Sequence, residues 1–568
     1  MSIAHSQDTS PLGLPCPPLP LGKDQGEATP WSSPPGAKGT KGRPPGRTAV
    51  RRARRLLLLI VATGAILRFY GLAAESFWFD EAYSVWVARH SLGWQFALST
   101  QRIFPLLYYV LLHFWLKLGS GEFVIRALSA LLGVGSLLVI YALARDLFDR
   151  RTALLSALLL AVSPLHIWFS QEARMYILVA TLGLCSAYSM RLALRRVPET
   201  AVQKSTCGRA CPWVAYVLST ALAINGHYFA LFLLPFHNLY VLYLIARRQV
   251  HRGVLGKWLL SQGAVGLLSL VGLAGVFSDE SRYWWGLLDT LHGAPTPGDL
   301  LRLVFSFSLG TTVQSGILYA VGLLVFGSCA ALSLLQIVPE AEGKRLRVGP
   351  RLQGKRLSLA LDDGMVFTLL YLLVPLGTVF AYSQFRSSWV LRYLFPFLPP
   401  YCILLARGLL RLPGRFLGLS VTCALLLLTL WPLANTYRYQ QKEDWRSTAQ
   451  YIAAREQPGD VLLMVDEDAW LPFEHYYSGS LYHMGVSRTV TDRDFLWSRV
   501  GLATASYQRI WLVLSHTNNV LLKGILQQHP ATRMVAEQHF LLVEVDLFAV
   551  RPGGLRPNGE VVPSGVGS

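Results

Sequence analysis

The chain has 568 residues, of which 52% are hydrophobic and only 15% are charged, against about 25% charged residues in an average soluble domain. Its mean hydropathy of +0.38 and its apolar runs, several of them close to the ~20 residues that span a bilayer as a helix, exclude an ordinary soluble enzyme, a disordered regulator and a fibrous protein. The net charge of +19 comes from basic residues between these runs, which is typical of cytoplasmic loops, so the sequence predicts a multi-pass protein that contacts membrane lipids and no nucleic acid.

The chain begins with a segment, 1–50, that is rich in proline, glycine and serine and shows no apolar periodicity. We expect it to be a disordered cytoplasmic tail, because such a composition cannot bury enough surface to offset the entropy of ordering. A cluster of arginines at 51–55 directly precedes the first apolar run, 56–74. Basic residues beside a first span hold the preceding segment in the cytoplasm.

The predicted membrane domain, 51–434, contains one apolar segment that is too short to span. This segment, 105–118, follows a first outer loop at 75–104, and we interpret it as a re-entrant or juxtamembrane helix. Counting it as a span would invert every later loop and place the basic loops outside. With the first run, the remaining runs predict about eleven spans: 124–144, 152–169, 175–194, 212–226, 229–246, 254–277, 315–338, 364–382, 393–411 and 416–434.

The character of the chain changes after the last span. Residues 435–551 open with a helix-like stretch, KEDWRSTAQYIAARE, and continue with three strand-like runs, PGDVLLMV, RIWLVLS and HFLLVEVDLFAV. An odd number of spans places this segment outside the cytoplasm, and 552–568 is again a disordered tail. The predicted fold is therefore mainly α, a polytopic helical membrane protein with a small C-terminal extracytoplasmic α/β domain.

Two adjacent carboxylates, Asp80 and Glu81, lie in the aromatic stretch ESFWFDEAYS just after the first span. Desolvation near a membrane surface raises the pKa of a carboxyl group, and a carboxylate so placed can act as a general base or hold a divalent cation. An equally good interpretation makes Asp80 the N-cap of EAYSVWVARH, with the aromatic residues as an interfacial belt.

Charged residues occur at two more span ends on the same predicted face. Glu172 and Arg174 lie in the tight turn FSQEARMY, and Arg126 lies inside the apolar stretch FVIRALSALLGVG. Glu172 would supply a second carboxylate, and arginine binds phosphate through paired hydrogen bonds and stays charged near lipid. The plainer interpretations are a surface ion pair for Glu172 and Arg174, and an Arg126 side chain that reaches back to the interface.

His227 and Tyr228 lie at a break between two apolar runs, and Arg392 and Tyr393 open a later span. Each again has a plain interpretation, a packed histidine or an interfacial arginine. Together, carboxylates and arginines gathered on one membrane face suit a substrate whose phosphate is anchored to lipid. The candidate residues for binding that substrate are Arg126, Arg174, His227, Tyr228, Arg392 and Tyr393.

The order of three segments resembles the GT-C superfamily of polytopic glycosyltransferases. They are FWFDEAYSVWVA, PLLYYVLLHFWLKLGSGEFVIRALSALLGVGSLLVIYALARDLF and AVSPLHIWFSQEARMYILVA. The resemblance is to bacterial members related to protein O-mannosyltransferases and lipid A aminoarabinose transferases. NGHYF, VLRYLFPFLPP and KEDWRSTAQYIAAREQPGDVLL also resemble later segments of that family.

The resemblance implies transfer of a sugar from a polyprenyl-phosphate donor to an acceptor on the extracytoplasmic face of a bacterial inner membrane. It implies a catalytic base at Asp80 with Glu81 beside it, a second acidic residue at Glu172 and an arginine at Arg126. We expect an inverting reaction. The resemblance does not identify the acceptor, which can be a protein, a lipid or a glycan. It also does not decide whether a divalent metal ion is a cofactor.

The sequence departs from the family pattern at one motif, and two other functions are possible alternatives to a glycosyltransferase. Many relatives carry His-Pro-Pro before the Leu-Tyr-Tyr of the short helix, whereas this chain has Phe104, Pro105 and Leu106. A transporter or flippase of lipid-linked sugar would favour polar residues in mid-membrane and internal repeats, which the predicted spans do not show. An inactive GT-C-like scaffold is the other alternative, although the Asp80 and Glu81 pair is retained.

Overall fold

The computed structural model describes most of the chain between 47 and 551. The described residues are 47–101, 106–195, 206–250, 252–278, 293–313, 316–339, 351–352, 355–359, 361–465, 469–486, 490, 492–515 and 520–551. The predicted tail at 552–568 lies outside them, as do Phe104, Pro105 and all of the predicted N-terminal tail except 47–50, which belongs to the first helix.

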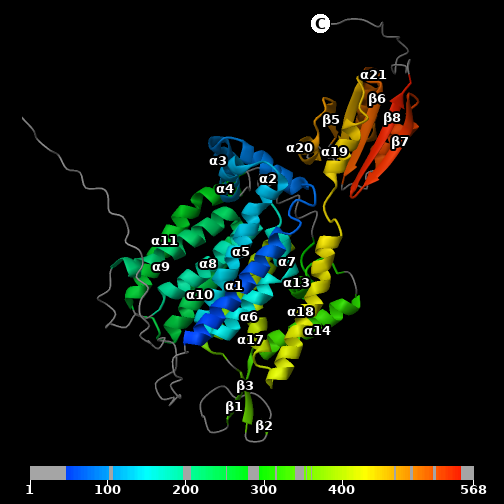
Figure 1. Cartoon of the computed structure of the whole chain (residues 1–568). Helices are drawn as coiled ribbons and strands as arrows, with labels where there is room; N and C mark the ends of the chain where they lie inside the picture. The colour runs from blue at the N-terminus through cyan, green and yellow to red at the C-terminus, as the bar shows by residue number, and fades with distance from the viewer. Residues whose placement is uncertain are drawn as a thin grey trace, which may run out of the picture.

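A bundle of helices forms the larger part of the molecule (Figure 1). At its centre α8 packs between α5 and α9, while α6 contacts α1, α5 and α17. The long helices and paired segments of the bundle are α1 (Arg47–Phe69), α5 (Glu122–Leu147), α6 (Arg150–Ala161) with α7 (Pro164–Ser170), α8 (Tyr176–Ala193), α9 (Thr206–Gly226), η3 (Tyr228–Phe232) with α10 (Leu233–Ala246), α11 (Arg252–Ala274) with η4 (Gly275–Phe277), α13 (Pro297–Leu309), α14 (Gly316–Leu332), α15 (Asp363–Ser383), α16 (Leu391–Leu394) with η5 (Phe395–Phe397) and α17 (Leu398–Leu409), and α18 (Arg415–Arg438).

Six of the described helices are long and apolar enough to cross a membrane, and a seventh candidate is the pair α6 and α7, which is bent by 62°. The bend follows from the sequence, because Ser163 caps α7 by accepting a hydrogen bond from the backbone N–H of His166, and Pro164 opens the new helix. Large apolar side chains such as Leu260 and Leu267 stay exposed on α11, as expected of a surface that contacts lipid. The chain is therefore a multi-pass membrane protein, and the number of eleven spans stays a prediction.

The predicted first outer loop contains two helices, α2 (Phe79–Arg89) and α3 (Leu92–Gln101). The short segment that follows is helical as expected, with α4 (Leu106–Trp115) continuing into η1 (Leu116–Leu118). It is among the apolar helices that are too short to count as spans. Tyr108, Tyr109 and Leu112 bury one side of α4, which contacts α2, α3, α5 and α9.

The C-terminal part is a five-stranded sheet with helices, and it lies at one end of the bundle (Figure 1). The strand order is β5-β4-β6-β8-β7; β4 runs parallel to β5 and β6, whereas β8 runs antiparallel to β6 and β7. Its elements are α19 (Trp445–Ala453), β4 (Asp460–Val465), α20 (Trp470–Tyr476), β5 (Tyr482–Val486), α21 (Arg493–Ser506), β6 (Arg509–Ser515), α22 (Val520–Gln528), β7 (Thr532–Phe540) and β8 (Val543–Val550).

The expected strands are present in this sheet, but one strand-like run predicted from the sequence contains parts of two strands. The run HFLLVEVDLFAV is divided by a tight turn, in which Leu542 has a φ of 60°, so the run holds the end of β7 and all of β8. The opposite end of the bundle carries a small antiparallel sheet, β1 (Leu335–Pro339), β2 (Arg351–Leu352) and β3 (Lys355–Leu359) (Figure 1).

Candidate functional site

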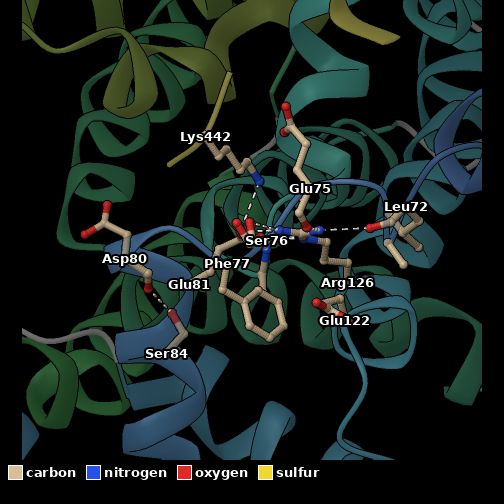
Figure 2. A network of polar contacts seen from close by, with 12 residues as sticks. Leu72, Glu75, Ser76, Phe77, Asp80, Glu81, Ser84, Glu122, Arg126 and Lys442 are labelled. Carbon is tan, nitrogen blue, oxygen red and sulfur yellow. Dashed lines mark hydrogen bonds and ion pairs between the residues drawn. The ribbon is translucent and has the colours of Figure 1, made fainter. Parts of the chain in front are cut away.

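The two adjacent carboxylates occupy the first turn of α2 and point in different directions (Figure 2). Successive residues of an α-helix are rotated by about 100° about its axis, because a turn takes 3.6 residues. The N-cap position belongs to Trp78, so the interpretation of Asp80 as the N-cap is wrong. Asp80 and Glu81 therefore enter two different surroundings.

Glu81 is completely buried and accepts four hydrogen bonds. Its Oε1 accepts from Arg126 Nε and from the backbone N–H of Ala173, each at 2.8 Å. Its Oε2 accepts from Arg126 Nη2 at 2.6 Å and from Lys442 Nζ at 3.0 Å. Burial would raise the pKa of Glu81, but Arg126, Lys442 and the Ala173 N–H outweigh it and lower that pKa to about 2.

Arg126 uses all of its donors inside the protein. Besides Glu81, its guanidinium donates to the backbone carbonyls of Leu72 at 3.0 Å, Glu75 at 2.8 Å and Ser76 at 3.1 Å (Figure 2). An arginine has five N–H donors, and these contacts account for them. With 2% of its surface exposed, Arg126 is paired inside the protein and does not extend into solvent. It holds the first loop, residues 70–78, against α5.

Asp80 lies between two other arginines. Its Oδ2 is 3.2 Å from Arg392 Nη1 and 3.7 Å from Arg174 Nη2. Arg174 Nη1 also donates to the Asp80 carbonyl at 2.9 Å and to Ser84 Oγ at 3.0 Å. The Asp80 side chain is 18% exposed, whereas Glu81 has no exposed surface, so of the two only Asp80 can meet a substrate.

Each of these two arginines has a buried donor without a partner among the described residues. The Nε atoms of Arg174 and Arg392 are buried and have no hydrogen-bond partner among the described residues. A buried donor without a partner costs free energy, so both atoms are suited to an anionic ligand. Arg392 is also a third exposed, and its guanidinium stacks over the Tyr393 ring at 5.6 Å.

A cavity of about 510 Å³ opens beside Arg392, between the bundle and the linker, residues 439–444, that joins α18 to α19. Aromatic and aliphatic side chains form much of its wall, and charged groups are set into that wall. The apolar residues include Trp78, Leu165, Trp168, Phe169, Leu391 and Leu542; the charged ones are Glu172, Arg392, Lys442 and Glu443. Such a cavity suits a ligand with an apolar body and an anionic group.

Glu172 contributes a carboxyl group to the wall of this cavity. It is 4% exposed, and its Oε2 has no hydrogen-bond partner among the residues that the structure describes. Burial raises the pKa of Glu172 to about 7, against the opposing influence of Lys442 and Arg174. Arg174 instead donates to Asp80 and Ser84, so Glu172 and Arg174 do not form the surface ion pair considered above.

His227, Tyr228 and Tyr393 form an aromatic cluster behind Arg392. The ring centroid of His227 is 4.6 Å from that of Tyr228 and 4.9 Å from that of Tyr393. His227 Nδ1 accepts from the backbone N–H of Phe229 at 3.2 Å, which caps η3. The structure thus packs His227 inside the protein, 4% exposed, and places Tyr393 against the arginine.

Lys442 is the site residue that the sequence interpretation missed. It was included in the helix-like opening KEDWRSTAQYIAARE, but α19 begins only at Trp445. The linker returns to the first loop, where Ser76 Oγ donates to the Glu443 carbonyl at 2.6 Å. The available signal was a Lys-Glu-Asp run directly after the last span, on the same predicted face as Asp80.

The charges around the carboxyl groups of Asp80 and Glu172 do not suit a divalent cation. Arg174 and Arg392 contact Asp80, and Lys442 and Arg174 act on Glu172. A metal ion between Asp80 and Glu172 would therefore lie beside three positive side chains. The donor set favours an anion at this position.

Comparisons with known proteins agree with this architecture. A family model described as dolichyl-phosphate-mannose-protein mannosyltransferase, PMT_2, matches residues 104–274. No curated protein matches the chain.

Solved structures resemble most of the chain. ArnT from Cupriavidus metallidurans in the apo state is 16% identical over 87% of this chain and 98% of that one, with a TM-score of 0.52. The same enzyme bound to undecaprenyl phosphate, also 16% identical over the same shares, has a TM-score of 0.51. The Archaeoglobus fulgidus oligosaccharyltransferase in complex with Zn and sulfate is 13% identical over 89% of this chain and 74% of that one, with a TM-score of 0.51.

At these identities the structures show the fold, and the family model adds a sequence match over the segment from α4 to α11. The resemblance expected from the sequence is thereby confirmed: the chain has the fold of the GT-C glycosyltransferases and carries a PMT_2 segment.

Proposed function

We propose that this protein is a membrane glycosyltransferase that moves a sugar from a polyprenyl-phosphate donor to an acceptor hydroxyl, with inversion and with Asp80 as general base. The observation that carries the proposal is the position of Asp80. Its partly exposed carboxylate contacts Arg392 at 3.2 Å, and Arg392 lines the amphipathic cavity. The reacting carboxylate and the phosphate-binding surface are therefore neighbours.

The cavity supports a lipid-linked donor. Trp78, Trp168 and Phe169 offer an apolar wall to an isoprenoid chain. Arg392, which lines the same cavity and whose Nε has no partner among the described residues, offers a charge-assisted hydrogen bond to a phosphate. The ArnT structure with undecaprenyl phosphate has the same fold, which adds support by analogy.

The proposed reaction is a single displacement. The acceptor oxygen attacks the anomeric carbon and passes its proton to Asp80, while the bond from that carbon to the phosphate oxygen breaks. The polyprenyl phosphate leaves with the electron pair, and Arg174 and Arg392 stabilise the charge that develops on it. Glu172, whose raised pKa keeps much of it protonated near neutral pH, can hydrogen-bond to the acceptor or to the phosphate.

Five candidates from the sequence take supporting roles in this proposal. Glu81 and Arg126 have no unused bonding capacity for substrate, so they hold the first loop and thereby the start of α2. His227, with Tyr228 and Tyr393, supports Arg392 from behind. We further propose that the site faces the extracytoplasmic side of a bacterial inner membrane, with the N-terminus in the cytoplasm, as the basic loops indicate.

The test follows release of polyprenyl phosphate from several polyprenyl-phosphate sugars by the purified protein in detergent, with and without a chelator. We expect release by the wild type, and a loss of about 10²- to 10⁴-fold in Asp80→Asn, because general-base catalysis contributes about that much. Wild-type release by Asp80→Asn would exclude Asp80 as the base. Tight binding of polyprenyl phosphate without release from any donor would instead favour the transporter or scaffold.

A further inference from the structure

Lys442 carries a positive charge that the contacts around it do not use up. Its Nζ donates to Glu81 Oε2 at 3.0 Å, and an ammonium group has three donors. No second acceptor for Nζ is found among the described residues. Lys442 also lines the cavity, so an anion bound there would lie beside this side chain.

The charge balance around Glu81 points in the same direction. Arg126 already neutralises Glu81 through two hydrogen bonds. Glu172, the other carboxyl group on which Lys442 acts, is neutral in much of the protein near pH 7, because burial raises its pKa. Lys442 therefore adds a positive charge that these two carboxyl groups do not fully balance. The Lys442 side chain is only 7% exposed, and a buried cation in excess is costly. An anionic ligand in the cavity, whose other cation is Arg392, would balance that charge.

Lys442 reaches this position because its neighbours are fixed on both sides. The backbone N–H of Gln441 donates to Glu75 Oε1 at 2.5 Å, and the carbonyl of Glu443 accepts from Ser76 Oγ at 2.6 Å. The next backbone N–H, that of Asp444, donates to the carbonyl of Leu541 at 3.1 Å, in the turn between β7 and β8. The first loop and the C-terminal sheet thus both determine where Lys442 lies.

We propose that Lys442 binds the phosphate of the lipid-linked donor, and that the linker supplies it from outside the helical bundle, so that the site is complete only while the linker is docked on the first loop. This proposal rests on the proposed function for the identity of the ligand. It assigns to the C-terminal part a direct share in substrate binding, since Leu542 lines the same cavity.

The experiment measures binding to the full-length protein in detergent of two probes, undecaprenyl phosphate and the uncharged undecaprenol, through quenching of tryptophan fluorescence. Lys442→Met should weaken binding of the phosphate by about 10- to 100-fold, as expected for a charge-assisted hydrogen bond worth about 1.5–3 kcal/mol, and leave binding of undecaprenol unchanged. Lys442→Arg should restore most of the affinity. The matched control is Lys117→Met, which removes an exposed lysine of η1.

Equal affinity of Lys442→Met and wild type for undecaprenyl phosphate would overturn the proposal, and so would an equal loss for both probes, which indicates a structural role. If Lys442→Met fails to fold, Lys442→Gln replaces it, because glutamine keeps a hydrogen-bond donor for Glu81 without the charge. Wild-type affinity for undecaprenyl phosphate, or an equal loss for both probes, would again overturn the proposal. Binding needs no turnover, so these results stand apart from the Asp80→Asn test. Undecaprenyl phosphate bound normally through Lys442 by a protein without transfer would contradict only the proposed function.

Discussion

Asp80 and Glu81 show how neighbouring residues of one type can have opposite roles. Glu81 is a buried anion with four donors, and breaking such a pair by removing one partner costs about 3–5 kcal/mol. We therefore expect Glu81→Gln to lower the free energy of unfolding by about that amount, whereas Asp80→Asn should change it by less than ~1 kcal/mol. Thermal unfolding of the two variants in the same detergent measures the difference. Equal stability of the two would contradict the assignment of Glu81 as a supporting residue.

Glu172 makes donor binding depend on pH. Because burial raises its pKa to about 7, the carboxyl group is mostly neutral below that pH and mostly negative above it. The added negative charge repels the phosphate, so the affinity for a polyprenyl-phosphate sugar, a diester whose own charge is constant in this range, should fall as pH rises from 6 to 8. We expect a fall of roughly tenfold, which corresponds to about 1.4 kcal/mol.

The control for this pH dependence is Glu172→Gln, which cannot ionise. Its affinity for the donor should stay constant between pH 6 and 8 and should equal or exceed that of the wild type at pH 8. A wild-type profile without slope, or an unchanged slope in Glu172→Gln, would show that another group titrates.

At the scale of helices and strands, the sequence predicts where elements lie better than how they are joined. The long apolar runs are helical over most of their length, because a helix pairs the backbone N–H and C=O groups within the segment, as the bilayer core requires. The runs around β4, β6 and β8 are strands that are largely buried on both faces. The bend between α6 and α7 was missed although Ser163 and Pro164 mark it. The turn at Leu542 was missed because it lies in the continuous apolar stretch 540–543.

The candidate site could be predicted in part for the same reason. The ends of the spans indicated that Asp80, Arg174 and Arg392 share one face, and the structure brings them into contact. The pairing of Arg126 with Glu81 depends on how α5 is rotated about its axis, which no local pattern reveals. Lys442 was missed because its contact with Glu81 spans 361 residues of sequence.

At the scale of the whole molecule, polar contacts join the C-terminal part to the bundle, beside the apolar packing of Leu471 and Tyr476 on the bundle core. Arg446 Nη2 lies 2.5 Å from Glu122 Oε1, and the Tyr476 hydroxyl donates to the same oxygen at 2.9 Å. That hydroxyl also accepts from the backbone N–H of Phe77 at 2.7 Å. An interface of mixed polar and apolar contacts between parts of one chain resembles a transient protein interface. We therefore expect that weakening these contacts lets the C-terminal part separate from the bundle and moves Lys442 with the linker.

The double variant Arg446→Met and Tyr476→Phe should weaken this docking without disturbing either core, because Tyr476→Phe removes only a hydroxyl and Arg446 is a third exposed. We expect faster proteolysis within the linker and a loss of about two- to tenfold in affinity for undecaprenyl phosphate, the range that one net hydrogen bond supplies. Tyr482→Phe, which alters an exposed tyrosine of β5, is the matched control and should change neither quantity. If the linker is cut faster while the affinity stays at the wild-type value, the C-terminal part does not complete the site, and Lys442 must reach the phosphate without it.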